Sequence, residues 1–311
     1  MRIPLNALGL VLTLCLGLAS SRDGCAAPML IVSIGDSITQ GDNSHNTWRR
    51  PLWQSLTNAG FSVDFVGSIN RNYAGPGNPG VYPPSPDFDL DHEGHWEFTV
   101  DMLAVSLPGW LTNYPPPDLA LLHAGTRDCI LGEVMTNTVL DLKAIIDVLR
   151  ARNSRIVILL AKIIPTTFSP AAIANITNLN AQLDGLAASK TTPASPVIIV
   201  DQYTGFNANN DTWDGIRPDA DSGEPKMAQK WFAALRVVLQ PPRLTKVELL
   251  DNTTAQLSAT GVNGVAYRLL AGTNLLNWTS IATNTATPSG TLNFTDPGAS
   301  TPYRFYQIVT P

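Results

Sequence analysis

The chain has few cysteines, few histidines and few charged residues. Its 311 residues include three cysteines, at positions 15, 25 and 129, and four histidines. Because the first cysteine lies in an N-terminal apolar stretch, we expect Cys129 to have no disulfide partner, so a core has to stabilise the fold. A chain of this length with 44% hydrophobic residues can bury such a core. The histidines and cysteines show no metal-ligand spacing, so we predict neither a metal nor a cofactor.

Runs of basic residues are also absent. The chain has 20 Lys and Arg against 25 Asp and Glu, a formal net charge of -5. This balance indicates neither a nucleic-acid partner nor binding to an anionic membrane surface. The sequence gives no indication of an oligomeric state.

The N-terminus has the pattern of a secretory signal peptide. Arg2 precedes an apolar stretch at 7–18, which is too short to span a membrane, and small and polar residues follow it. We predict a signal peptide over residues 1–27, with Ser20 or Ser21 as an alternative cleavage position. The mature protein is then secreted, periplasmic or located at the cell surface.

Strands and helices alternate along the first three quarters of the chain. Near-continuous apolar runs indicate parallel strands that are covered on both faces, and segments with helical periodicity separate them. This order predicts a doubly wound α/β sheet, which binds ligands beyond the carboxyl ends of its strands. The predicted strands are 30–34, 62–67, 119–124, 155–164 and 196–201, and the main predicted helices are 48–58, 133–152 and 171–188.

The composition changes after residue 240. Pro241 and Pro242 break the chain, and short apolar runs separated by Gly, Asn, Asp and Pro turns follow. We predict an α/β domain over 28–240, a linker at 241–242 and a small all-β sandwich over 243–311. This module has no catalytic motif, so glycan binding, tethering and a spacer role all stay open. Its predicted strands are 246–250, 255–259, 266–271, 278–282, 291–294 and 303–309.

A serine follows the first predicted strand in a position suited to a nucleophile. The apolar run leads directly into Gly-Asp-Ser at 35–37. A serine hydroxyl is a weak nucleophile, so it needs a base within hydrogen-bond reach and donors directed at the developing oxyanion. Two further segments have the required polar residues: Gly-Thr-Arg-Asp at 125–128 follows a strand, and Asp-Gly-Ile-Arg at 214–217 precedes a helix.

Together with His-Glu-Gly-His at 92–95, these segments resemble the sequence blocks of the SGNH hydrolases, also called GDSL esterases. Within that family the chain is most similar to secreted carbohydrate esterases of the acetylxylan type, over about residues 28–240. The resemblance implies the flavodoxin-like SGNH hydrolase fold and hydrolysis of acyl esters on an acetylated polysaccharide. It also implies that Ser37 is the nucleophile and that Asp214 orients a base.

Three positions depart from the family pattern, and all three carry catalytic roles in it. Glu97 stands where the family has an oxyanion-hole glycine, and Arg127 stands where it has the asparagine of Gly-Thr-Asn-Asp. Arg217 replaces the histidine of Asp-x-x-His, which is the general base. Arginine offers donors but no acceptor, so Arg217 cannot take a proton from Ser37. We therefore predict an impaired or inactive member of the family.

Several neighbours of these positions are candidates for substrate binding. Asp36, His95, Trp96 and Asp128 belong to the same sequence blocks. A long segment at 70–91, rich in Pro and Gly, precedes them and is expected to be an ordered surface excursion that shapes a groove. Tyr73, Tyr82 and Trp96 are candidates for stacking on sugars, and packing of this loop is the alternative role for the same aromatic rings.

Two other functions stay open beside the inactive one. The first is an active esterase in which one of the other histidines has become the base; these are His45, His92, His95 and His123. A histidine nitrogen within hydrogen-bond reach of Ser37 would favour it.

The second is a glycan- or anion-binding module without catalysis. If the fold is kept, Glu97, Arg127, Asp214 and Arg217 converge near Ser37 and can form an ion-paired network. Arginines left partly free in that network would bind a carboxylate or sulfate of an acidic polysaccharide through forked hydrogen bonds. A pair between Arg217 and Asp214 or Glu97 would weaken the enzyme hypothesis.

Overall fold

The computed structural model describes residues 27–239, 242–251, 253–261, 263–299 and 303–309. The predicted signal peptide therefore lies outside the described residues except for Ala27, as does Pro241 of the predicted linker. The residues up to 239 form one compact unit, and those from 242 onward belong to a second.

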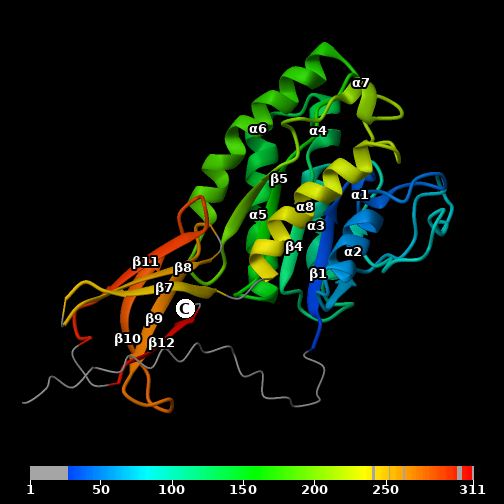
Figure 1. Cartoon of the computed structure of the whole chain (residues 1–311). Coiled ribbons are helices and arrows are strands. Elements are labelled where there is room, and N and C mark those ends of the chain that lie inside the picture. Colours follow the sequence, from blue (N-terminus) through cyan, green and yellow to red (C-terminus); the bar gives the residue numbers. More distant parts are fainter. Residues whose placement is uncertain (1–26, 240–241, 252, 262, 300–302, 310–311) are drawn as a thin grey trace, which may run out of the picture. The chain divides into compact units, whose positions relative to one another are not determined.

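The first unit is built on a parallel sheet with helices on both faces (Figure 1). Its strand order is β2-β1-β4-β5-β6, and the short β3 also pairs with β1. Without β3 this is the flavodoxin-like order, in which the strand sequence reverses next to β1. The doubly wound α/β fold predicted from the sequence is thus confirmed. The strands are β1 (Met29–Gly35), β2 (Val63–Val66), β3 (Glu93–Gly94), β4 (Leu119–His123), β5 (Val157–Lys162) and β6 (Val197–Asp201).

Two apolar clusters cover the two faces of this sheet. Along β1, Val32 and Ile34 face one cluster, which contains α3, α5 and α6 side chains, while Ile31 faces the other, which contains α2 and α8 side chains. This alternation is what a strand with both faces buried requires. The helices are α1 (Ser37–Gln40), α2 (Arg49–Asn58), α3 (Val100–Trp110), α4 (Thr126–Leu131), α5 (Met135–Arg152), α6 (Pro170–Lys190), α7 (Ala208–Asp211) and α8 (Gly223–Leu239).

The second unit consists of two three-stranded antiparallel sheets, β11-β8-β7 and β10-β9-β12. Alternate residues of β8 are buried, namely Ala255, Leu257 and Ala259, so one face of its sheet contributes to a small core. The predicted small all-β fold is confirmed. Its strands are β7 (Arg243–Leu249), β8 (Ala255–Thr260), β9 (Ala266–Gly272), β10 (Thr279–Thr285), β11 (Thr291–Asp296) and β12 (Phe305–Val309).

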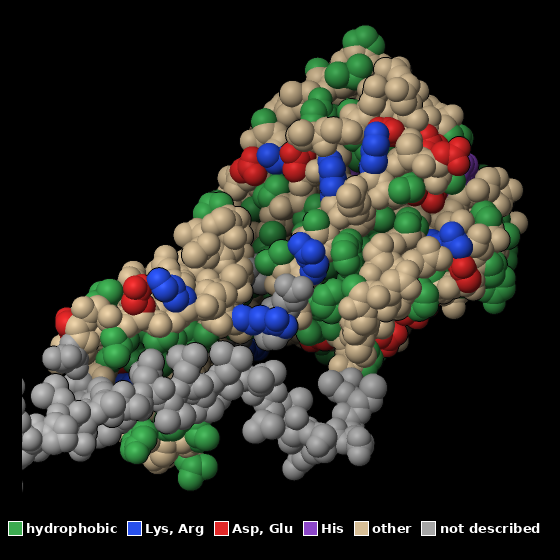
Figure 2. All heavy atoms as spheres, in the orientation of Figure 1, with side chains coloured by type: hydrophobic (Ala, Val, Ile, Leu, Met, Phe, Trp, Pro, Cys, Tyr) green, Lys and Arg blue, Asp and Glu red, His purple; other side chains and the backbone are tan. Residues whose placement is uncertain are grey.

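Within the described residues, no helix combines the length and the apolar character that crossing a membrane requires. On the face drawn in Figure 2, basic and acidic side chains are interspersed and do not gather by sign.

Candidate active site

Ser37 is separated from the end of β1 by Asp36 alone and is the first residue of the short helix α1. The Asp36 side chain caps this helix, because its Oδ1 accepts the Ile38 backbone N–H at 3.0 Å. The preceding Gly35 allows β1 and β4 to approach closely, since a Cβ at that position would lie 2.2 Å from the His123 carbonyl oxygen. Ser37 is buried but lines a pocket, at the carboxyl end of the sheet.

Arg49, at the start of α2, fixes the far end of α1. Its Nε donates to the Thr39 carbonyl at 2.8 Å, and its Nη2 donates to the Gln40 carbonyl at 3.0 Å and to the Asn72 side chain at 3.1 Å. The residue is 1% exposed, and burial lowers the pKa of its guanidinium to about 9. Arg49 was not among the predicted site residues, because nothing in the sequence around it indicates a buried cation.

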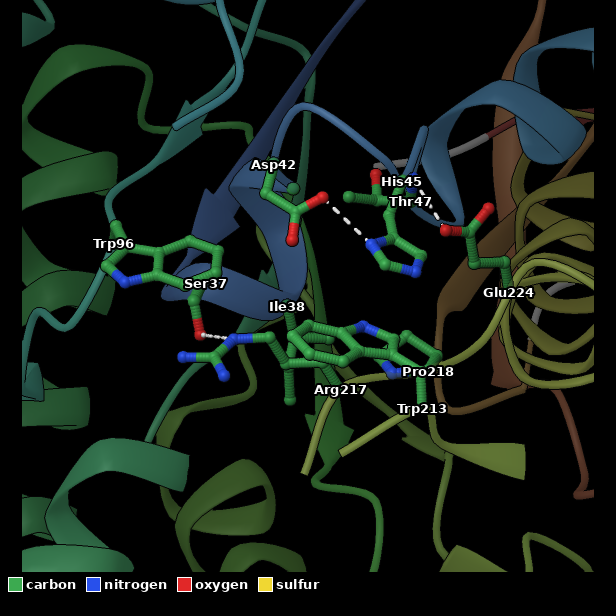
Figure 3. A pocket seen from close by; sticks show the side chains of 11 residues that line it. Ser37, Ile38, Asp42, His45, Thr47, Trp96, Trp213, Arg217, Pro218 and Glu224 are labelled. Atoms are coloured by element: carbon green, nitrogen blue, oxygen red, sulfur yellow. Dashed lines mark hydrogen bonds and ion pairs between the residues drawn. The ribbon is translucent and has the colours of Figure 1, made fainter. Parts of the chain in front are cut away.

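Arg217 contacts both Ser37 and Asp214. Its Nε donates to the Ser37 Oγ at 3.0 Å (Figure 3), and its Nη1 donates to the Asp214 Oδ2 at 2.6 Å. The other carboxylate oxygen of Asp214 accepts the backbone N–H groups of Ile216 and Arg217, at 2.9 and 2.7 Å. The three side chains are joined in the order of a serine–base–acid triad, but a guanidinium occupies the central position.

Aromatic rings enclose the Arg217 guanidinium. Its Cζ lies 4.0 Å from the ring centroid of Trp96 and 5.8 Å from that of Trp213. Trp96 stacks on Tyr73 at 4.5 Å, and Trp213 stacks on His45 at 4.8 Å. Tyr73 and Arg217 thus both pack on the Trp96 ring system, which reduces the ring surface left for stacking on a sugar. Tyr82, the third predicted sugar-stacking residue, is half exposed and lies under Arg71 at 3.3 Å.

Glu97 and Arg127 form a separate and looser pair. The Arg127 Nη2 lies 3.9 Å from the Glu97 Oε2, and 55% of the Glu97 side chain is exposed. Glu97 has a φ of 61°, in a turn closed by the hydrogen bond from the Phe98 N–H to the His95 carbonyl. A left-handed backbone is what the glycine of the family pattern would adopt without strain.

The remaining predicted binding residues have partners within the fold. Asp128 accepts the Val100 backbone N–H, at 3.3 and 3.2 Å from its two oxygens, at the start of α3. His95 is paired with Glu93 at 2.9 Å and stacks on Trp110 at 3.7 Å. Burial raises the pKa of both Asp128 and Asp36 to about 6.

None of the four histidines, all of which are described, is hydrogen-bonded to Ser37. Both His92 ring nitrogens are used, since Nδ1 accepts the Gly94 N–H at 2.9 Å and Nε2 donates to the Arg71 carbonyl at 3.2 Å. His123 is buried in β4, and burial lowers its pKa to about 4. His45 has its Nδ1 2.8 Å from an Asp42 oxygen and lines the same pocket as Ser37.

The far side of the pocket is acidic. Glu224, at the start of α8, accepts the Thr47 backbone N–H at 2.9 Å, and burial raises its pKa to about 7. Asp42 accepts the Ser44 N–H at 2.8 Å in addition to its bond with His45. No group of three or more His, Cys, Asp or Glu side chains in the described part of the chain could hold a metal ion. The pocket lining includes Ser37, Asp42, His45, Trp96, Trp213, Arg217 and Glu224.

Solved structures of carbohydrate esterases are similar to the first unit. A family 3 carbohydrate esterase from Talaromyces cellulolyticus is 31% identical, with a TM-score of 0.58 and coverage of 68% of this chain and 98% of that one. An acetyl esterase mutant with an acetate ion is 30% identical, with the same coverage and TM-score. A family 3 carbohydrate esterase from Clostridium thermocellum is 29% identical, with a TM-score of 0.57 and coverage of 68% and 97%.

No curated protein sequence matches the chain. The sequence model of the GDSL-like lipase/acylhydrolase family matches residues 33–221, which include the end of β1 and every block on which the resemblance was based. The resemblance stated from the sequence is therefore confirmed, and this chain belongs to the GDSL-like lipase/acylhydrolase family.

Proposed function

We propose that this protein has lost the serine esterase reaction of its family and binds carbohydrate without hydrolysing it. The observation that carries the proposal is the bond from the Arg217 Nε to the Ser37 Oγ at 3.0 Å, together with the pair between Arg217 and Asp214 at 2.6 Å. The position from which a base would act on Ser37 is filled by a permanent cation.

The chemistry follows from the direction of this hydrogen bond. A donor to Oγ stabilises an alkoxide, but the serine proton still needs an acceptor, and a guanidinium has none. The Asp214 carboxylate accepts two backbone N–H groups and the Arg217 Nη1, and no hydrogen bond joins it directly to Ser37 within the described residues. Losing a triad member costs on the order of 10⁴-fold in protease examples. We therefore expect no serine-dependent turnover above background.

The ligand class is proposed from the relatives and from the pocket. The similar solved structures at 29% to 31% identity are named as carbohydrate esterases or an acetyl esterase. The pocket lies at the carboxyl end of the sheet, where α/β folds bind ligands, and two tryptophans contribute to its wall. The sequence pattern at residues 1–27 adds the proposal that the protein meets this ligand after export.

An active esterase with a substitute base is the second candidate. The observation in its favour is the pair between His45 and Asp42, which lines the pocket that contains Ser37. A carboxylate that accepts from Nδ1–H leaves Nε2 of the imidazole as a basic nitrogen.

Hydrolysis of a chromogenic acetate ester tests both candidates. We would compare the wild-type protein with Ser37→Ala and His45→Ala, each checked for folding by a thermal melt. Equal background rates in all three proteins are expected. Wild-type turnover that disappears in Ser37→Ala would overturn the proposal. If the same turnover also disappears in His45→Ala, His45 is the base. Calorimetry with an acetylated xylo-oligosaccharide then tests ligand binding.

A further inference from the structure

The Arg217 guanidinium keeps unused hydrogen-bond donors at the pocket. A guanidinium has five N–H donors. Two of them are accounted for, by the Ser37 Oγ and by the Asp214 Oδ2. No other acceptor for Arg217 is found in the described part of the chain, and 18% of its side chain is exposed. The remaining donors are available to a ligand.

Ser37 adds a donor at the same place. Its Oγ accepts from Arg217, so its own proton is not needed in that bond and can be donated. Since the Ser37 Oγ and the Arg217 Nε are 3.0 Å apart, a hydroxyl donor and a charged fork lie next to each other. A serine hydroxyl that is not deprotonated can donate a hydrogen bond to an oxygen atom of a ligand, but it is a poor nucleophile toward the carbonyl carbon of an ester.

The cation is held rigidly. The rings of Trp96 and Trp213 both lie near it, with centroids 4.0 and 5.8 Å from its Cζ, and each of these rings stacks on a further ring, that of Tyr73 or His45. A guanidinium fixed in this way loses little conformational entropy when a ligand binds, and its partial desolvation strengthens charge-assisted hydrogen bonds.

The acidic groups that line the pocket, Asp42 and Glu224, and the adjacent Asp214 already accept hydrogen bonds from protein donors. Asp214 binds Arg217, Asp42 binds His45 and the Ser44 N–H, and Glu224 binds the Thr47 N–H. They lower the net attraction for an anion, so recognition has to come from directed bonds rather than from bulk charge. A planar carboxylate, with two oxygens that match a guanidinium fork, satisfies this requirement best.

We infer that Arg217 and Ser37 form a carboxylate-binding site, and that the carbohydrate bound in this pocket carries a carboxylate, as a uronic acid does. This inference rests on the proposed function, because it assigns Ser37 to binding. On this inference, the arginine that stands at position 217 in place of the family's histidine provides ligand specificity and also removes catalysis.

Calorimetric titration at fixed low ionic strength tests the inference. The probes are an oligosaccharide that ends in glucuronic acid and the same oligosaccharide with the carboxylate converted to the neutral amide. The wild-type protein should bind the acid at least tenfold more tightly than the amide. Arg217→Met should remove this preference, Arg217→Lys should retain part of it, and Ser37→Ala should weaken binding of the acid several-fold.

Arg236→Met is the matched control, since Arg236 is an exposed arginine in the last turn of α8. It should bind both probes as the wild type does. Thermal melts identify unfolded variants, and Arg217→Lys and Ser37→Ala still carry the test if Arg217→Met does not fold.

Equal binding of acid and amide, absence of binding of the acid, or a preference that Arg217→Met leaves intact would overturn the inference. In those cases, binding of the acetylated neutral oligosaccharide would leave the proposed function standing. Serine-dependent ester hydrolysis would instead overturn the proposed function, whatever the acid and amide titrations give.

Discussion

At the scale of single residues, the proposed loss of catalysis depends on the groups that surround Ser37. Ser37 keeps the position and the cap that the fold provides, with Asp36 bonded to the Ile38 N–H. Arg217 fills the central position between Ser37 and Asp214. The candidate site thus joins a serine hydroxyl, a guanidinium and a carboxylate in one chain of hydrogen bonds.

Restoring the family residues should restore activity. In Glu97→Gly/Arg127→Asn/Arg217→His, the new imidazole can bond both Ser37 and Asp214, because Arg217 already does so from the same backbone position. We expect esterase activity on the order of 10³-fold or more above the wild type, measured with a chromogenic acetate ester. Adding Ser37→Ala to this variant should abolish the gain. A folded revertant without activity would show that these positions do not correspond to the family blocks.

The backbone at Glu97 allows a separate prediction about stability. Its φ of 61° costs a residue with a Cβ about 1–2 kcal/mol of stability, and glycine avoids this cost. Glycine also has greater conformational freedom in the unfolded chain, which offsets part of the gain. Glu97→Gly should therefore raise the free energy of unfolding by about 0.5–1 kcal/mol, measured by denaturant titration. Glu97→Ala removes the same carboxylate but keeps the Cβ, so it should give no such gain. Equal effects of the two variants would assign the change to charge.

At the scale of elements, the apolar runs in the sequence locate the strands well, but not their ends. The predicted strand at 155–164 is longer than β5, which ends at Lys162. The reason is that the Asn180 side chain pairs with both the N–H and the C=O of Ile163, at 2.8 and 2.9 Å, and replaces the strand partner. A contact with a residue of α6 cannot be read from the sequence of the strand.

Helix α3 was not among the predicted elements. It contains Pro108, which argues against a helix in a local reading, and its first N–H group is satisfied by Asp128 from α4. The candidate site was also predictable only in part. The order of the motifs pointed to Ser37 and Arg217, whereas the stacking of Tyr73 on Trp96 and of His45 on Trp213 depends on loops whose path the sequence does not determine.

Arg49 connects two elements, and its loss should be costly. Its substitution by Met would leave the carbonyls of Thr39 and Gln40 without their buried donors. We expect a loss of about 3 kcal/mol or more in the free energy of unfolding. The adjacent Arg50 is the matched control, because it pairs with a half-exposed Asp87 at the surface, at 2.6 Å. Arg50→Met should cost less than about 1 kcal/mol, and similar losses in both variants would contradict the positioning role of Arg49.

At the scale of the whole molecule, stability should depend on pH through buried acids. Burial raises the pKa of Glu224 to about 7 and the pKa values of Asp36 and Asp128 to about 6. A raised pKa in the folded state means that the folded protein binds the proton more tightly than the unfolded chain does. The stabilisation is complete below the unfolded pKa and is lost as pH rises through the folded pKa.

Glu224→Gln isolates one of these groups, because the amide keeps an acceptor for the Thr47 N–H and cannot ionise. Between pH 5 and pH 7.5 the wild type should lose on the order of 2–3 kcal/mol of unfolding free energy relative to this variant. Denaturant unfolding of both proteins at the two pH values measures the difference. A constant difference would mean that Glu224 titrates normally in the folded protein.

The enclosure of Arg217 also has an optical consequence. Trp96 and Trp213 are two of seven tryptophans, and both lie within 6 Å of the same cation, at 4.0 and 5.8 Å. An indole that has a fixed positive charge above its ring emits at a wavelength that depends on that charge. A ligand that moves the guanidinium or pairs with its charge should therefore change the intrinsic fluorescence of the protein, without a label.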